Sequence, residues 1–260
     1  MYNFEFVKPS NVADALAALA SEEAQALGGG QTLIPTMKQR LASPEKLVSL
    51  LGISEMQGVD VSGNIVTIGG ATTHANVAAA DAFSGLTGLA SGIGDPAVRN
   101  RGTIGGSLAN NDPAACYPAA ALATGATIVT NSREISADDY FQGMFTTALK
   151  EVEIITAVRI PVPLASNYQK FEQPASRFAL VGVFVAKYVD GVRVAITGAS
   201  ENGVFRWSEA EAALSVNFSY DAISSLSVDA SDMISDLHGT KEYRANLVRV
   251  LTGRAVLSAS

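Results

Sequence analysis

The chain has 260 residues, of which 48% are hydrophobic and 17% are charged, and this composition excludes a disordered or coiled-coil protein. With 18 Lys and Arg against 25 Asp and Glu, the net charge of −7 argues against a nucleic acid or an anionic membrane as the main partner. The single cysteine, Cys116, excludes an internal disulfide and a cluster held only by cysteines of this chain. Without a signal peptide or a run of about 18 apolar residues, we expect a cytoplasmic protein.

The first fifty residues predict a β-α-β-α-β unit. Phe4 and Phe6 alternate on one face of a short strand, which a turn at Lys8-Pro9 closes. A helix rich in Ala and Leu is expected over residues 12–21, and an apolar strand over residues 24–27. Three glycines then lead into a helix near Thr32, and residues 46–50 read as the next strand.

The middle of the chain predicts strands and short helices around a loop-rich segment. A hairpin is expected about residues 62–64, with helices after Thr73 and over 86–93, and strands over 127–130 and 153–160. Residues 94–120 hold the densest glycine and asparagine region. Turn chemistry this concentrated inside a domain usually serves a functional site.

A change of composition near Val162 predicts a boundary between two domains. The first would span residues 1–165, in lobes of about 1–55 and 56–165, and the second residues 166–260. The second domain carries a strong antiparallel hairpin signal over 180–189 and 192–198, and helical patterns over 208–214 and 241–257. The expected class is α+β, with a three-stranded antiparallel sheet and helices in the second domain.

The sequence LGGGQTL, residues 27–33, leaves a predicted strand and enters a predicted helix. Three glycines let the backbone turn sharply and approach a ligand, and amides at a helix start can cradle a phosphate. The spacing matches neither a dinucleotide-binding fingerprint nor a Walker A loop. An ordinary strand-to-helix turn explains this loop equally well.

The second glycine loop reads RNRGTIGGSLANNDP, residues 99–113. Thr103 and Ser107 place hydroxyls beside backbone amides, and Asp112 can accept hydrogen bonds from a sugar or ribityl hydroxyl. Arg99 and Arg101 add positive potential near a pyrophosphate, or else are solvated or buried beside acidic neighbours. Two such loops in one domain favour a long diphosphate cofactor between two lobes.

These motifs together resemble the FAD-binding medium subunits of molybdenum hydroxylases, the carbon monoxide dehydrogenase and xanthine dehydrogenase type enzymes. The resemblance rests on LGGGQTL followed by RNRGTIGGSLANNDPAA, and extends through FEFVKP, EIITAVRIP and KFEQPASRFALVGVFVA. It implies a two-lobed FAD-binding domain of the PCMH type, FAD as cofactor, and neither a catalytic residue nor a metal ligand in this chain.

The resemblance also implies which residues bind the cofactor. The first loop would wrap the FAD diphosphate through backbone amides, namely Ala26, Leu27, Gly28, Gly29, Gly30, Gln31, Thr32 and Leu33. A second clamp would comprise Thr103, Ile104, Gly105, Gly106 and Ser107. Asp112 would bind a hydroxyl or a group near the phosphates, Ile93 would line the cofactor, Ile155 would contact the adenine end, Lys170 would lie near the flavin ring, and Phe178 would cover one flavin face.

Four of these positions depart from the family pattern. Gly28 stands where alanine is usual, Thr32 where serine is usual, and Ser107 where asparagine is frequent. Phe178 in place of tyrosine keeps a ring for stacking but drops a hydroxyl.

The implied function is electron transfer, because this chain carries no nucleophile–base pair and no second cofactor signature. In the family, a large molybdopterin subunit oxidises substrate and a small subunit relays electrons through two [2Fe–2S] clusters. The FAD of the medium subunit passes them to an acceptor such as NAD or a quinone, in a dimer of heterotrimers. A self-contained FAD-dependent oxidase of the same fold and a nucleotide-binding regulatory module are the alternatives.

Overall fold

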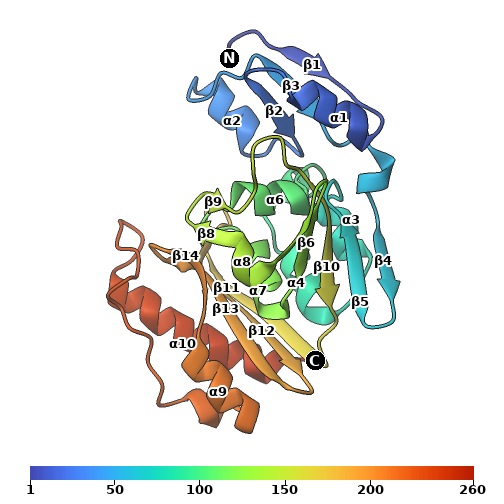
Figure 1. The fold of residues 1–260 in the computed structure, drawn as a ribbon. Coiled ribbons are helices and arrows are strands. Elements are labelled where there is room, and N and C mark those ends of the chain that lie inside the picture. Colours follow the sequence, from blue (N-terminus) through green and yellow to red (C-terminus); the bar gives the residue numbers. More distant parts are fainter.

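A small parallel sheet forms the N-terminal lobe of the computed structural model, which describes residues 1–260 (Figure 1). Its strand order is β1-β3-β2. Asn11 caps the first helix by accepting the N–H of Asp14 at 2.8 Å, and Ala15 and Leu19 bury one face of that helix. The predicted β-α-β-α-β unit is confirmed, with these bounds: β1 Glu5–Val7, α1 Val12–Leu19, β2 Ala24–Leu27, α2 Leu33–Lys38 and β3 Lys46–Ser49.

The central lobe is built on a five-stranded antiparallel sheet of order β4-β5-β10-β6-β7. The predicted hairpin lies at the start of this sheet, where Gly63 adopts a φ of +60° between β4 and β5. The strands are β4 Val59–Ser62, β5 Ile65–Gly69, β6 Thr127–Thr130, β7 Glu134–Ser136 and β10 Ile155–Pro161, and a separate hairpin pairs β8 Phe141–Gly143 with β9 Thr146–Thr147.

Helices of the central lobe pack around α7, which is buried along its whole length. Half of its eight residues are alanine, so neighbouring elements can approach it closely. The helices are α3 His74–Ala79, α4 Ser84–Ser91, α5 Pro96–Arg99, α6 Ile104–Asn110, α7 Tyr117–Thr124 and α8 Ala137–Tyr140. In Figure 1, α6 lies directly beneath the N-terminal lobe.

The C-terminal sheet has four antiparallel strands in the order β11-β12-β13-β14. The expectation of three strands is therefore wrong. The sequence located only the two strands of the central hairpin, which became β12 and β13, and the structure adds an edge strand on each side, β11 and β14. The elements are β11 Ala165–Glu172, β12 Ala179–Tyr188, β13 Gly191–Ser200, β14 Gly203–Arg206, α9 Ser208–Val216 and α10 Lys241–Ser258.

Strand β12 separates two hydrophobic cores. Val181, Val183 and Val185 belong to the core that α9 and α10 cover, whereas Phe184 and Ala186 belong to the core of the central lobe. Because successive side chains of a strand point to opposite faces, one strand supplies both cores. The C-terminal sheet thus packs with one face on α7 and with the other on its own helices.

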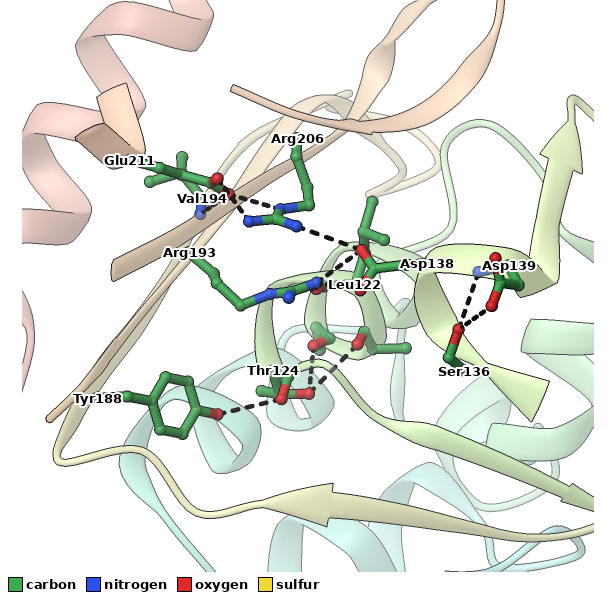
Figure 2. Close-up of polar contacts among 12 residues, drawn as sticks. Leu122, Thr124, Ser136, Asp138, Asp139, Tyr188, Arg193, Val194, Arg206 and Glu211 are labelled. Carbon is green, nitrogen blue, oxygen red and sulfur yellow. Dashed lines mark hydrogen bonds and ion pairs between the residues drawn. The ribbon is translucent and has the colours of Figure 1, made fainter. Parts of the chain in front are cut away.

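Polar contacts fix the same junction at the end of α7 (Figure 2). Tyr188 donates its hydroxyl to the carbonyl oxygen of Thr124 at 3.3 Å, and Arg193 donates to that of Leu122 at 2.8 Å. Both carbonyls lie in the last turn of α7, where a helix runs out of i+4 donors, and that of Leu122 also accepts the N–H of Gly125 at 3.3 Å. Arg193 and Arg206 also pair with Asp138, at 2.7 and 3.4 Å. A polar cavity of about 520 Å³ lies along this junction.

No helix of the structure is long and apolar enough to span a bilayer.

Candidate functional site

The two glycine loops predicted from the sequence are in direct contact. A Cβ atom added to Gly29 would lie 2.0 Å from the carbonyl oxygen of Arg101, and one added to Gly28 would lie 2.9 Å from Oγ1 of Thr103 and 3.7 Å from Cα of Gly106. Only a residue without a side chain fits the Gly29 position. The backbone of the first loop, which belongs to the N-terminal lobe, therefore packs directly against the backbone of the second loop.

A third glycine segment, residues 69–74, completes the contact, and sequence reasoning missed it. Gly105 donates its N–H to the carbonyl oxygen of Gly70 at 2.9 Å, and His74 donates its N–H to that of Gly102 at 2.9 Å. A Cβ on Gly70 would lie 2.1 Å from the carbonyl oxygen of Ile155, so Ile155 underlies this segment. The Gly-Gly pair at the end of β5 was the available signal, but it reads equally well as the close of a hairpin.

The first loop presents a run of unpartnered backbone donors. None of the amides from Gly28 to Leu33 donates a hydrogen bond to any protein group. Gly30 has a φ of +72°, which lets the chain turn back at this point. Consecutive free amides in a tight turn form a concavity that suits an anion, and the start of α2 follows directly. The predicted loop residues thus fit a diphosphate group.

The second loop has less free donor capacity. The amides of Ile104 and Gly105 bond the carbonyl oxygens of Thr72 and Gly70, and that of Gly106 bonds Oγ1 of Thr103, which caps α6. The hydroxyl of Ser107 is half-buried and bonds no protein group. This loop therefore serves chiefly as the base on which the first loop rests.

Asp112 follows the end of α6, where Asn111 adopts the left-handed conformation with a φ of +43°. One carboxylate oxygen, Oδ1, accepts the N–H of Ala114 at 2.8 Å. The other oxygen, Oδ2, bonds no protein group, so it remains available to a hydroxyl donor.

Three residues predicted to contact FAD, namely Ile93, Lys170 and Phe178, lie in one hydrogen-bonded region. The ammonium group of Lys170 donates to the carbonyl oxygens of Gly92 at 2.6 Å and Arg177 at 2.8 Å, and its side chain is only 6% exposed. Gly92 precedes Ile93, and Arg177 precedes Phe178, a residue that is 53% exposed. Lys170 therefore joins the two segments that carry Ile93 and Phe178.

Arg99 and Arg101 do not pair with acidic residues, which corrects one of the two roles considered for them. Arg99 donates to the carbonyl oxygens of Ile93 at 3.0 Å and Gly94 at 2.8 Å, so it shapes the turn beside Ile93. Arg101 is exposed.

His74 is buried against the second loop, where a Cβ on Gly102 would lie 2.5 Å from its Nε2 atom. Burial, and secondarily the positive charge of Arg99, lower the pKa of His74 to about 4. Burial also raises the pKa of the Cys116 thiol. The thiol is therefore not activated as a nucleophile.

Comparison with known proteins places these loops in a described family. The family described as "FAD binding domain in molybdopterin dehydrogenase" matches residues 2–163. The carbon monoxide dehydrogenase medium chain of Afipia carboxidovorans is 33% identical, over 98% of this chain and 96% of its own. The nicotine 6-hydroxylase medium subunit of Paenarthrobacter nicotinovorans is 32% identical, over 98% of this chain and 96% of its own.

Solved structures agree with the sequence comparison. A structure of reconstituted CO dehydrogenase from Oligotropha carboxidovorans superposes with a TM-score of 0.88, at 31% identity, over 99% of this chain and 98% of that chain. Quinoline 2-oxidoreductase from Pseudomonas putida 86 gives a TM-score of 0.84 at 26% identity, over 98% and 95%. The chain belongs to the family of FAD-binding medium subunits of molybdenum hydroxylases, and FAD is its cofactor.

Proposed function

We propose that this chain is the electron-transfer subunit of a molybdenum hydroxylase complex. Its FAD would take electrons from the [2Fe–2S] clusters of a small subunit and pass them to an external acceptor such as NAD or a quinone. Substrate oxidation would belong to a large molybdopterin subunit, and the assembly would be a dimer of heterotrimers. The relatives named above are medium subunits of larger enzymes. We assign partner subunits to this chain by analogy with them.

The observation that carries this proposal is the run of free amides from Gly28 to Leu33, pressed against the second loop. The amides would hold the diphosphate without a charged side chain, because oriented N–H dipoles favour an anion. If the chain were a nucleotide-binding regulatory module, its ligand would need only the amides that hold the diphosphate. Lys170 and Phe178, which lie on another part of the molecule, would then have no role in binding.

At the flavin end, we assign orientation to Lys170 and stacking to Phe178. An exposed phenyl ring beside the cofactor covers a flat ring system and leaves the other flavin face free. The fixed ammonium group of Lys170 favours negative charge developing near it. Both residues act by placement and electrostatics, since the redox chemistry belongs to the cofactor.

The decisive experiment is purification of the tagged chain from its native host, followed by flavin, iron and molybdenum analysis. We expect flavin to elute with iron and molybdenum, together with a small and a large subunit. Flavin reduction by the substrate of the complex would require both partners. An isolated chain that turns over a small organic substrate by itself would support the oxidase alternative instead.

The acceptor is tested on the same complex after reduction. Reoxidation rates are measured with NAD and with a soluble quinone, using the isolated chain with FAD as a control. The fast acceptor identifies the exit path, and reoxidation by neither would contradict the proposed role.

A further inference from the structure

The loop that carries Asp112 is held by the C-terminal sheet. The carbonyl oxygen of Pro113 accepts two hydrogen bonds from β13, one from the N–H of Gly198 at 2.6 Å and one from the hydroxyl of Thr197 at 2.8 Å. The same hydroxyl lies 2.7 Å from the carbonyl oxygen of Ala115. Thr197 is fully buried, so no water competes for this bond.

A second anchor holds the other side of Asp112. The side-chain amide of Asn111 donates to the carbonyl oxygens of Gly143 at 2.8 Å and Thr146 at 2.9 Å, both in the β8–β9 hairpin. Asp112 therefore lies between Asn111, which is bonded to this hairpin, and Pro113, which is bonded to β13. The N–H of Ala114 holds Oδ1 of the carboxylate, and the two anchors fix the backbone on either side, which leaves Oδ2 free.

Arg244 of α10 supports the β13 anchor from behind. Its Nη1 atom donates to the carbonyl oxygens of Leu180 at 2.7 Å and Gly198 at 2.8 Å, and Nη2 pairs with Asp236 at 2.8 Å. Its side chain is 4% exposed. Leu180 lies two residues after Phe178, so one buried guanidinium links the strand that follows Phe178 to the strand that holds Pro113.

We propose that Thr197 is a positioning residue for the cofactor, fixing the Asp112 carboxylate by clamping the carbonyl groups on its C-terminal side. The inference rests on the proposed function, and it takes Asp112 as a ligand of the bound FAD, the role that the family resemblance implies. The C-terminal domain completes the FAD site through β13, although Thr197 itself does not touch the cofactor.

The test compares three variants of the full chain. Thr197→Val removes the hydroxyl and keeps the shape of the side chain, and Thr197→Ser keeps the hydroxyl. Thr252→Val is the matched control, because Thr252 is also fully buried and donates to a carbonyl oxygen, that of Val248 at 2.7 Å within α10. Each variant is measured for FAD dissociation constant, visible flavin spectrum and unfolding temperature.

We expect Thr197→Val to weaken FAD binding by about tenfold and to shift the flavin spectrum, as loss of one buried hydrogen bond implies. Thr197→Ser should restore both. Thr252→Val should lower the unfolding temperature with FAD affinity unchanged. If Thr197→Val behaves like Thr252→Val, with only its unfolding temperature lowered, the proposal is overturned. A wild-type chain that binds no FAD would instead refute the proposed function.

A double-mutant cycle that combines the Thr197 substitution with Asp112→Asn gives a second measurement. If Thr197→Val does not fold, Thr197→Ala takes its place in this cycle. If Thr197 acts through the carboxylate, its loss should weaken FAD binding much less in the Asp112→Asn background. Equal fold-changes in both backgrounds would contradict the positioning role.

Discussion

Gly29 and Arg101 approach so closely that a Cβ atom on Gly29 would lie 2.0 Å from the carbonyl oxygen of Arg101. The neighbour is backbone, so it cannot move aside as a side chain can. At the adjacent position, a Cβ on Gly28 would meet a side-chain atom, Oγ1 of Thr103, at 2.9 Å, and this atom can shift by a few tenths of an ångström at the cost of its capping bond to Gly106. The two positions therefore differ in tolerance although they are consecutive glycines.

We predict that Gly28→Ala retains FAD and folds, whereas Gly29→Ala separates the two lobes and loses FAD. Overpacking against a fixed backbone costs about 1–3 kcal/mol or more, so Gly29→Ala should also lower the unfolding temperature. Flavin-to-protein ratio and thermal unfolding measure both effects. Equal FAD retention by the two variants would contradict the close contact between the loops.

Phe178→Ala should keep FAD but change its visible spectrum and its reoxidation rate. The ring is 53% exposed, so its removal should leave the unfolding temperature nearly unchanged. Phe6→Ala is the control, because Phe6 is 47% exposed on the N-terminal lobe. Identical flavin spectra for the two variants would remove the stacking role.

Lys170→Met should lower the free energy of unfolding by about 2 kcal/mol, because two carbonyl groups lose a charged donor. The loosened segment around Arg177 should also release Phe178, so the flavin spectrum should change in the same direction as in Phe178→Ala. Lys150→Met, at an exposed position, is the control for loss of charge. Denaturant unfolding and the flavin spectrum are the measurements, and an unaltered stability would contradict the bridging role.

His74 predicts a pH dependence of stability. Its pKa falls from 6.5 to about 4 on folding, so the unfolded chain binds more protons between these values. The contribution of His74 to the free energy of unfolding is therefore fully present above pH 6.5. It decreases as the pH falls towards 4, and about 2 kcal/mol is lost by pH 5. Because the folded chain takes up this proton only near pH 4, FAD release between pH 6.5 and 4 should accompany unfolding and not precede it.

The variant His74→Gln should lose most of this pH dependence between pH 6.5 and 4. Denaturant unfolding of both proteins at pH 7.5 and 5 gives the comparison, and FAD fluorescence follows release. A wild-type unfolding free energy that stays constant over this range would show that His74 is protonated in the folded chain.

The sequence predicted the elements of the fold well where periodicity was strong. The β12–β13 hairpin and α10 follow from their apolar patterns, and the glycine loops follow from their composition. The edge strands β11 and β14 escaped because most of their residues are only half-buried, so neither carries the apolar run that marks β12 and β13. The contact at Gly70 escaped because its partner, Gly105, lies 35 positions away in the chain, and no local pattern encodes that distance.

Contacts also change what a substitution does. Valine at Gly29 or Gly105 should disrupt folding as well as FAD retention, because a Cβ on Gly105 would lie 2.5 Å from the carbonyl oxygen of Gly70 and one on Gly29 would lie 2.0 Å from that of Arg101. The glycines at these positions therefore have two roles: they let the ligand approach the backbone, and they let the two lobes pack closely.

Strand β12 gives its alternate side chains to two cores, and this arrangement has a thermodynamic consequence. Neither core can melt while the other stays intact, because the strand that supplies both would have to be ordered and disordered together. Heating should therefore give one calorimetric transition for residues 56–260. A chain cut after residue 163 would leave the apolar surface of α7 facing water, so it should precipitate rather than fold.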